Sequence, residues 1–253
     1  LGIKGKDLDT DAEAHRWFDY WLKGVKNGIM DEPTIHYYVM GAPEKMAWRS
    51  ATKWPLKNEK RIRFYFSTST TNKLDSVGRG LLTREQPKSS NEFDTYLINY
   101  STTTGKYSRW NSVIQEIVYP DMSDNDSKSL TYTTHPLERD IEITGHPIIY
   151  LIISAQTTEL DFFVYLEEID KDDRSKYITE GCLRTSHRTL KKPSFQNHGL
   201  PYNRSNQGDI KNLKPGEPAK LVFDLLPTAY LFHKGNRIRI TIACADFDNF
   251  DTP

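Results

Sequence analysis

The sequence predicts a mainly β domain, an antiparallel β-sandwich or jelly roll, preceded by one amphipathic α-helix. Three observations lead to this prediction. Ten short runs of β-branched and aromatic residues follow Pro33, turn residues separate these runs, and helical periodicity is convincing only before Pro33. Many short strands without a second helix are typical of sandwiches and jelly rolls.

The helical segment begins near Thr10. Residues Thr10-Asp11-Ala12-Glu13 fit a capping box, with Thr10 as the N-cap residue and Glu13 three positions later. The apolar residues that follow share one face of a helix and are Ala14, Trp17, Phe18, Trp21, Leu22 and Val25. Gly24 and Gly28 are expected to end the helix. Such an aromatic stripe needs another surface to cover it.

The strands are expected where β-branched and aromatic residues gather. The predicted runs are Ile35–Met40, Ile62–Phe66, Tyr96–Tyr100, Val113–Tyr119, Ile141–Thr144, Ile148–Ala155, Phe162–Ile169, Tyr177–Leu183, Leu221–Leu225 and Ile238–Ala245. Ile238–Ala245 alternates apolar and polar residues, which predicts one buried face and one in water. Ile148–Ile153 is almost continuously apolar, which predicts burial on both faces.

Two polar stretches are interpreted as surface loops. They are Ser123–Ser129 and the long segment Lys191–Lys211. The second exceeds the ~12–15 residues of ordinary connections, so it is expected to be functional or mobile.

Composition limits the classes of partner. The chain has 253 residues, with 34 Lys+Arg against 34 Asp+Glu, and this zero net charge argues against nucleic acid or an anionic membrane as partner. Apolar runs are too short for a transmembrane helix, and the N-terminus lacks a signal-peptide stretch. We therefore expect a soluble protein, with the cytoplasm favoured. Because the chain begins with Leu1, we expect a fragment or a processed product.

The sequence shows no catalytic machinery and no metal site. An α/β-type serine hydrolase needs Gly-x-Ser-x-Gly, and none of the 14 glycines has a Ser two positions later. Ser186 and His187 are adjacent, so on a strand they would point to opposite faces. Glu167 and Glu168 are separated in the same way. Asp170–Asp173 lacks the glycine and the closing glutamate of a calcium loop and is interpreted as a charged turn. No cofactor is expected.

Two aromatic residues are candidates for ligand contact. Tyr107 and Trp110 follow Gly105 in a loop-like stretch before the predicted strand at Val113. Exposed aromatic rings on a jelly roll can stack on a sugar or an acyl group, although core packing or sealing a domain interface is the more common role of such rings. The acidic stretch Asp246–Asp251 is interpreted as a loop cap, with an ion site as the alternative.

Several stretches together resemble a known family. Trp17-Phe18-Asp19-Tyr20-Trp21 is similar to the last helix of the hydrolase domain in cocaine esterase, α-amino acid ester hydrolases and X-prolyl dipeptidyl-peptidases. The other matching stretches, in order, are Val39-Met40-Gly41, Asp140–Gly145, Asp161–Asp170, Glu180–Arg188 and Ala245–Phe250. Together they extend over nearly the whole chain.

The resemblance implies a particular arrangement. Residues 1–30 would be the terminal helix of a mostly missing α/β-hydrolase domain, and residues 31–253 a galactose-binding-like jelly roll without its closing strand. The parent would be a serine hydrolase that cleaves small ester or amide substrates through an acyl-enzyme. This chain would be its non-catalytic C-terminal β-sandwich, which stabilises the hydrolase domain and forms one wall of the cleft. Tyr107 and Trp110 would line that cleft.

The residues of the helix stripe complete the set of candidate sites. Trp17, Phe18, Trp21 and Leu22 are expected to form the interface with the hydrolase domain. Two alternatives stay open: a free-standing carbohydrate-binding module that uses Trp110, and an interaction module that forms homo-oligomers through the Trp17/Trp21 face.

Overall fold

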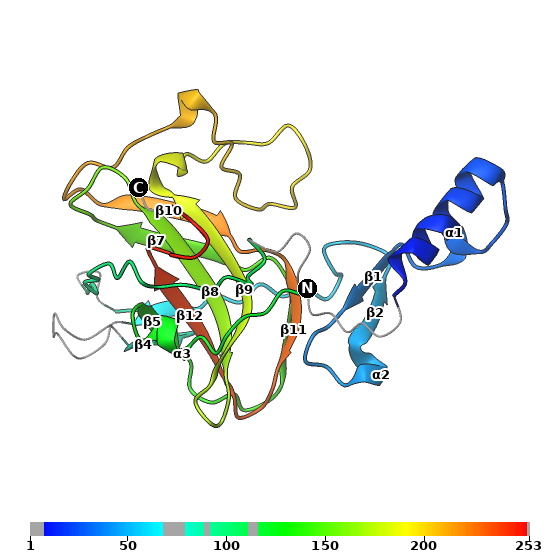
Figure 1. The fold of residues 1–253 in the computed structure, drawn as a ribbon, viewed down its shortest axis with the longest axis horizontal. Helices are drawn as coiled ribbons and strands as arrows, with labels where there is room; N and C mark the ends of the chain where they lie inside the picture. Colours follow the sequence, from blue (N-terminus) through cyan, green and yellow to red (C-terminus); the bar gives the residue numbers. More distant parts are fainter. Residues whose placement is uncertain (1–7, 68–78, 89–91, 111–115, 252–253) are drawn as a thin grey trace.

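The computed structural model describes residues 8–67, 79–88, 92–110 and 116–251. The N-terminal part contains helix α1 (Thr10–Lys23), a short 3-10 turn η1 (Ile29–Asp31), strands β1 (Ile35–Tyr38) and β2 (Trp48–Ala51), and between them the short helix α2 (Glu44–Ala47). The remaining chain is almost entirely strands and loops. Figure 1 shows α1 projecting away from the large β part.

One layer of the β part is a six-stranded sheet. It contains β3 (Tyr65–Ser67), β4 (Arg79–Thr83), β5 (Leu130–Thr133), β12 (Arg237–Ala243), β8 (Asp161–Ile169) and β9 (Ser175–Arg184), in this spatial order. β12 pairs antiparallel with both β5 and β8, while β4 and β5 run parallel. The last strand of the chain, β12, therefore lies in the middle of the sheet.

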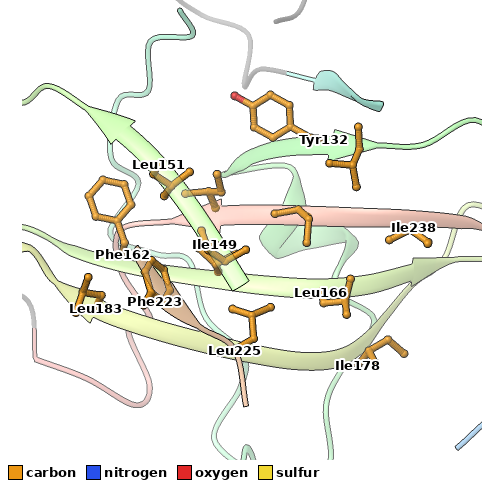
Figure 2. Packing of buried hydrophobic residues seen from close by; sticks show 14 of the residues in the cluster. Tyr132, Ile149, Leu151, Phe162, Leu166, Ile178, Leu183, Phe223, Leu225 and Ile238 are labelled. Carbon is orange, nitrogen blue, oxygen red and sulfur yellow. The ribbon is translucent and has the colours of Figure 1, made fainter. Parts of the chain in front are cut away.

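The opposing layer consists of two antiparallel pairs. β7 (Ile148–Ile153) pairs with β10 (Ala219–Asp224), and β6 (Ile141–Gly145) pairs with β11 (Thr228–Phe232). Figure 2 shows side chains from β7, β8, β9, β10 and β12 meeting between the layers. These residues belong to one hydrophobic core, so the fold is mainly β with two layers packed face to face.

Gly181 allows the two layers to approach closely at the end of β10. A Cβ atom at this position would lie 2.7 Å from the Asp224 carbonyl oxygen and 2.9 Å from the Leu225 Cα atom. One residue further along this connection, the Leu226 N–H donates to the carbonyl of Glu180, the residue before Gly181, at 2.8 Å. A side chain here would push β9 away from the connection after β10.

The β1–β2 hairpin is joined to the sandwich by two backbone hydrogen bonds of Met40. The Met40 N–H donates to the Ala229 carbonyl at 2.9 Å, and the Leu231 N–H donates to the Met40 carbonyl at 2.8 Å. Gly41 follows with a φ of 80°, and a Cβ there would lie 2.8 Å from the Leu231 carbonyl oxygen. A glycine is required at this position for both reasons.

The predicted strands agree with the structure in most places. Eight of the ten runs contain an observed strand. Tyr96–Tyr100 forms none, and of Val113–Tyr119 only residues 116–119 are described, without a strand. The strands that the sequence interpretation missed are β2, β4, β5 and β11.

Three local predictions are wrong. The second face of Ile238–Ala245 does not lie in water, because Thr241 and Ala243 are fully buried. β7 is not buried on both faces, because Tyr150 and Ile152 are exposed, Ile152 by 80%. The six-stranded sheet covers only the core side of β7. The N-cap of α1 is Asp9 rather than Thr10, since the Asp9 carboxylate accepts the backbone N–H groups of Asp11 and Ala12 at 3.0 Å each. Gly24 ends the helix as predicted, with a φ of 71°.

Replacing Leu166 with Ala tests the position of the core. Leu166 is buried on β8, so the lost contacts and the resulting cavity should lower the free energy of unfolding by about 2 to 5 kcal/mol. Ile152→Ala, on the exposed face of β7, is the matched control and should change it by less than about 0.5 kcal/mol. Urea unfolding measures both, and equal effects would contradict this assignment of faces.

Candidate functional site

The outer face of the six-stranded sheet holds a second, smaller cluster. All nine residues of β8 are buried, because the core covers one face and the segment before β5 covers the other. On the outer face, Phe163 and Tyr165 pack with Ala243 of β12 and with Met122, which precedes the short helix α3 (Ser123–Asp126). The covering segment contains Tyr107 and Trp110, so the candidate cleft residues lie on this cover.

Two buried carboxyl groups meet beneath the cover. Glu167 of β8 is fully buried and Asp126 of α3 nearly so. The Thr241 hydroxyl lies 2.7 Å from a Glu167 oxygen and 2.9 Å from an Asp126 oxygen. A hydroxyl has one hydrogen, so it can donate to only one of these carboxyl groups. This hydroxyl cannot satisfy two ionised carboxylates at once, and two buried like charges repel, so the arrangement favours a proton on one of them.

The neighbouring charge identifies Glu167 as the protonated group. Arg239 donates to Asp126 at 2.5 Å, so Asp126 holds the ion pair. Burial, followed by the charge of Asp126, raises the pKa of Glu167 well above its usual value, while Thr241 and Arg239 oppose this shift. Because Glu167 is inaccessible to solvent, this pair serves the packing of the cover and is not an acid/base pair for a substrate.

The interpretation of Ser123–Ser129 as a surface loop is wrong in part. Asn125, Asp126 and Ser129 are buried. Polar side chains usually indicate a solvated loop, but Asp126 is buried against Arg239 and Thr241 of the sheet. Asn125 accepts from the Thr103 N–H, and the Ser129 hydroxyl donates to the Asn125 carbonyl. By contrast, the separation of Glu167 from Glu168 is confirmed. Glu168 accepts from the Tyr230 hydroxyl at 2.5 Å and from the His233 N–H at 3.0 Å on the opposite side of β8.

Tyr107 and Trp110 lie on a loop without strands or helices. Tyr107 is 57% exposed and Trp110 is 39% exposed. The Trp110 ring packs edge-on against Phe250, with ring centroids 5.1 Å apart, and Phe250 in turn contacts Phe163 at 4.9 Å. Phe250 therefore supports the indole, and only the exposed part of the ring is available to a ligand.

Glu180 of β9 joins the loop that contains Tyr107 and Trp110 to the sheet. Its buried carboxylate accepts from the Tyr177 hydroxyl at 2.9 Å and the Tyr119 hydroxyl at 3.2 Å, and Arg109 lies 3.8 Å away. The two tyrosine rings stack with centroids 3.6 Å apart. Burial raises the pKa of Glu180, opposed first by the hydrogen bonds from Tyr177 and Trp110. The sequence offered no signal that would join these residues.

The remaining polar candidates have structural roles. The Asp170 carboxylate accepts the N–H groups of Asp172 and Arg174, as expected for a charged turn. Ser186 and His187 lie in a 3-10 turn, η2 (Thr185–His187), instead of at the end of a strand, and Ser186 is fully buried. Its hydroxyl is therefore inaccessible to a substrate. Within the described ranges, no group of three or more His, Cys, Asp or Glu could hold a metal ion.

The segment Lys191–Lys211 is folded back on itself. Leu190 pairs with Asn203, and buried Asp209, in the 3-10 turn η3 (Gln207–Asp209), forms ion pairs with Lys191 at 3.0 Å and Arg204 at 2.7 Å. A shallow groove of about 480 Å³ is lined by Pro55 and by residues between 192 and 199. Neither Tyr107 nor Trp110 contributes to its lining.

The candidate interface on α1 is open to solvent. No residue of α1 is buried, and Trp17, Phe18, Trp21 and Leu22 are each about half exposed or more. The Trp21 ring contacts the rings of Trp17, at a centroid distance of 5.7 Å, and Tyr20, at 5.2 Å, and both of these residues belong to α1 itself. In the part of the chain that the structure describes, no helix is long and apolar enough to span a bilayer.

Comparison with known proteins defines the class. Residues 27–253 match the family model of the X-Pro dipeptidyl-peptidase C-terminal non-catalytic domain. This is a class of β domains attached to hydrolases. The chain belongs to this family, and the family resemblance inferred from the sequence motifs is confirmed.

Named relatives are esterases and peptidases. The chain is 39% identical to a protein named as a serine esterase in Mycobacterium bovis, over 98% of this chain and 38% of that protein. It is 25% identical to cocaine esterase of a Rhodococcus strain, over 93% of this chain and 38% of that protein. It is 22% identical to a protein named as an Xaa-Pro dipeptidyl-peptidase in Bacillus cereus, over 92% of this chain and 33% of that protein. The chain therefore spans well under half the length of these relatives.

Solved structures share the fold. A CocE/NonD family hydrolase from Staphylococcus aureus matches 94% of this chain and 39% of its own, with a TM-score of 0.61 and 17% identity. An α-amino acid ester hydrolase matches 98% of this chain and 40% of its own, with a TM-score of 0.66 and 16% identity. At these identities the likeness concerns the fold alone.

The protonation of Glu167 predicts a pH-dependent stability. In the unfolded chain this carboxyl loses its proton above about pH 4.3, whereas the folded protein retains it. The free energy of unfolding should therefore fall as the pH rises toward the raised pKa of Glu167. The unfolding equilibrium constant should increase about tenfold per pH unit in this range.

The variant Glu167→Gln keeps a neutral hydrogen-bonding side chain and removes this proton. Denaturant unfolding across pH should show a shallower loss of stability in the variant than in the wild type. Glu168→Gln, on the other face of β8, is the control. Parallel pH profiles for Glu167→Gln and the wild type would show that Glu167 is ionised in the folded protein.

Proposed function

We propose that this chain is the C-terminal wall of a serine esterase whose hydrolase domain covers α1. The observation that carries the proposal is the exposed stripe of Trp17, Phe18, Trp21 and Leu22. A contiguous surface of large apolar side chains on a helix indicates a protein interface. In this arrangement residues 1–30 belong to the hydrolase domain and residues 31–253 form the jelly roll of galactose-binding type.

Ester cleavage is favoured over peptide cleavage. The relative with 39% identity carries a serine esterase name, whereas the relatives named as Xaa-Pro dipeptidyl-peptidases are only 22–23% identical. The reaction would follow the acyl-enzyme route, with its nucleophile, base and acid in the hydrolase domain. The sandwich would supply apolar surface to the acyl side of the cleft.

The loop with Tyr107 and Trp110 is the part of the sandwich proposed to face the substrate. Both rings present apolar surface to solvent, and no charged group is interposed between Trp110 and its partner Phe250. Aromatic rings favour apolar acyl groups and other rings. The loop is also held against the buried surface of the sheet, which gives a binding wall a fixed shape.

The interface claim is tested by Trp21→Asp. In the full-length protein, meaning this domain with the proposed hydrolase domain, the buried aspartate should weaken docking, lower the melting temperature and reduce esterase activity. In the 253-residue chain alone the same change should leave the melting temperature nearly unchanged, because Trp21 is exposed there. Lys23→Ala, at an exposed position of α1, is the control in both proteins.

The outcomes separate the open alternatives. An effect of Trp21→Asp in the full-length protein alone supports the interface. Loss of self-association in sedimentation of the 253-residue chain would instead favour a homo-oligomeric contact through the Trp17/Trp21 face. No effect in either protein would contradict the proposed role of α1.

The chain by itself should not cleave esters. The catalytic groups are proposed to lie in the hydrolase domain, and Ser186 is buried. We expect no turnover of p-nitrophenyl butyrate by the purified 253-residue chain, and turnover by the full-length protein. Turnover by the isolated chain that Ser186→Ala abolishes would overturn the proposed division of roles.

A further inference from the structure

The loop that carries Tyr107 and Trp110 is fixed by the segment that follows β12. Residues 99–110 contain no strand or helix, so their backbone groups need partners elsewhere. The Phe247 N–H donates to the Thr102 carbonyl at 2.8 Å, and the Thr102 hydroxyl donates to the Ala245 carbonyl at 2.7 Å. Two segments more than 140 residues apart in the sequence are thereby joined.

Asp246 is the centre of this junction. Its side chain is fully buried and accepts from the Thr104 N–H at 3.1 Å, from the Thr104 hydroxyl at 2.6 Å and from the Asn249 amide at 2.7 Å. A buried carboxylate is stable only with such donors, and hydrogen bonds to an ionised acceptor are among the stronger ones. The carboxylate therefore fixes Thr104 relative to the end of β12.

The same residue also fixes the turn that supports Trp110. The Asp246 carbonyl accepts the N–H groups of Asn249 and Phe250 at 3.0 Å each. That turn places Phe250 against the Trp110 ring, and it places the Asn249 side-chain oxygen 2.7 Å from the Ser108 hydroxyl that donates to it. Asp246 thus acts on both sides of the loop. Its carboxylate holds Thr104 and also the Asn249 amide, next to Phe250 in the turn that supports Trp110, while its backbone carbonyl completes that turn.

We propose that Asp246 is a positioning residue that sets the Tyr107–Trp110 loop as a rigid wall for bulky apolar acyl groups. This inference rests on the proposed function, since the wall faces a substrate only if the sandwich adjoins the hydrolase cleft. It goes further by assigning selectivity between acyl groups to a buried carboxylate that touches no substrate.

The kinetic test uses the full-length protein and two esters, p-nitrophenyl acetate and p-nitrophenyl phenylacetate. The small acetyl group does not need the aromatic wall, whereas the phenylacetyl group does. Asp246→Asn should raise the KM for phenylacetate by roughly tenfold and leave the KM for acetate within about twofold. Asp251→Asn, an exposed carboxylate of the same segment, is the control and should behave as the wild type.

A second arm separates positioning from general destabilisation. If Asp246 acts through Trp110, the double variant Asp246→Asn/Trp110→Ala should have the same phenylacetate KM as Trp110→Ala alone. Thr104→Val, which removes one donor and retains the backbone N–H, should give a smaller change in the same direction. Additive effects, or an equal loss of kcat for both esters, would overturn the proposal.

A spectroscopic readout distinguishes this inference from the proposed function. The contribution of Trp110 to the tryptophan fluorescence is obtained by subtraction. The emission spectrum of the Trp110→Phe variant is subtracted from that of the wild type, and the spectrum of Asp246→Asn/Trp110→Phe from that of Asp246→Asn. Asp246→Asn should shift this contribution to longer wavelength as the indole loses its support. An unchanged contribution would overturn the positioning role. A shift without any effect of Trp110→Ala on either ester would retain the positioning role and contradict the cleft wall.

Discussion

The burial of β8 on both faces is the constraint that organises this domain. An internal strand of a two-layer sandwich ordinarily packs on the core with one face and meets solvent with the other. Here every residue of β8 is buried, so the six-stranded sheet needs a cover on its outer face. The segment before β5 provides that cover through Met122. Its polar contacts with the sheet are those of Asp126, which accepts from Thr241 and Arg239, and of Tyr119, which donates to Glu180.

This cover explains why polar chemistry is buried in a domain without catalytic groups among its described residues. Glu167 is held neutral between Asp126 and Thr241, and Glu180 is held by two tyrosines. Both carboxyls join the cover to the sheet and are inaccessible to a substrate. Tyr107 and Trp110 reach the surface of this loop, with the exposed Lys106 beside Tyr107. Aromatic surface of this kind suits the acyl side of an esterase cleft.

The sequence predicted the features that follow from local periodicity. Alternation located most strands, the spacing of Trp17, Phe18 and Trp21 located the helix, and Gly24 located its end. The cover and the candidate site could not be predicted in this way. The Asp126–Glu167 pair, the Glu180 cluster and the Asp246 junction each join residues far apart in the chain. A polar residue is predicted to be exposed unless its distant partner is known. For this reason the sequence predicts Asp126 in a surface loop, whereas the structure buries it.

The most direct test of the central claim is a crystal structure of the full-length protein after reaction with phenylmethylsulfonyl fluoride, which labels the active serine of a serine hydrolase. We expect the hydrolase domain to cover Trp17, Phe18, Trp21 and Leu22 and the loop with Tyr107 and Trp110 to face the phenylmethyl group of the inhibitor. An exposed α1 stripe, or a loop that faces away from the modified serine, would contradict the account.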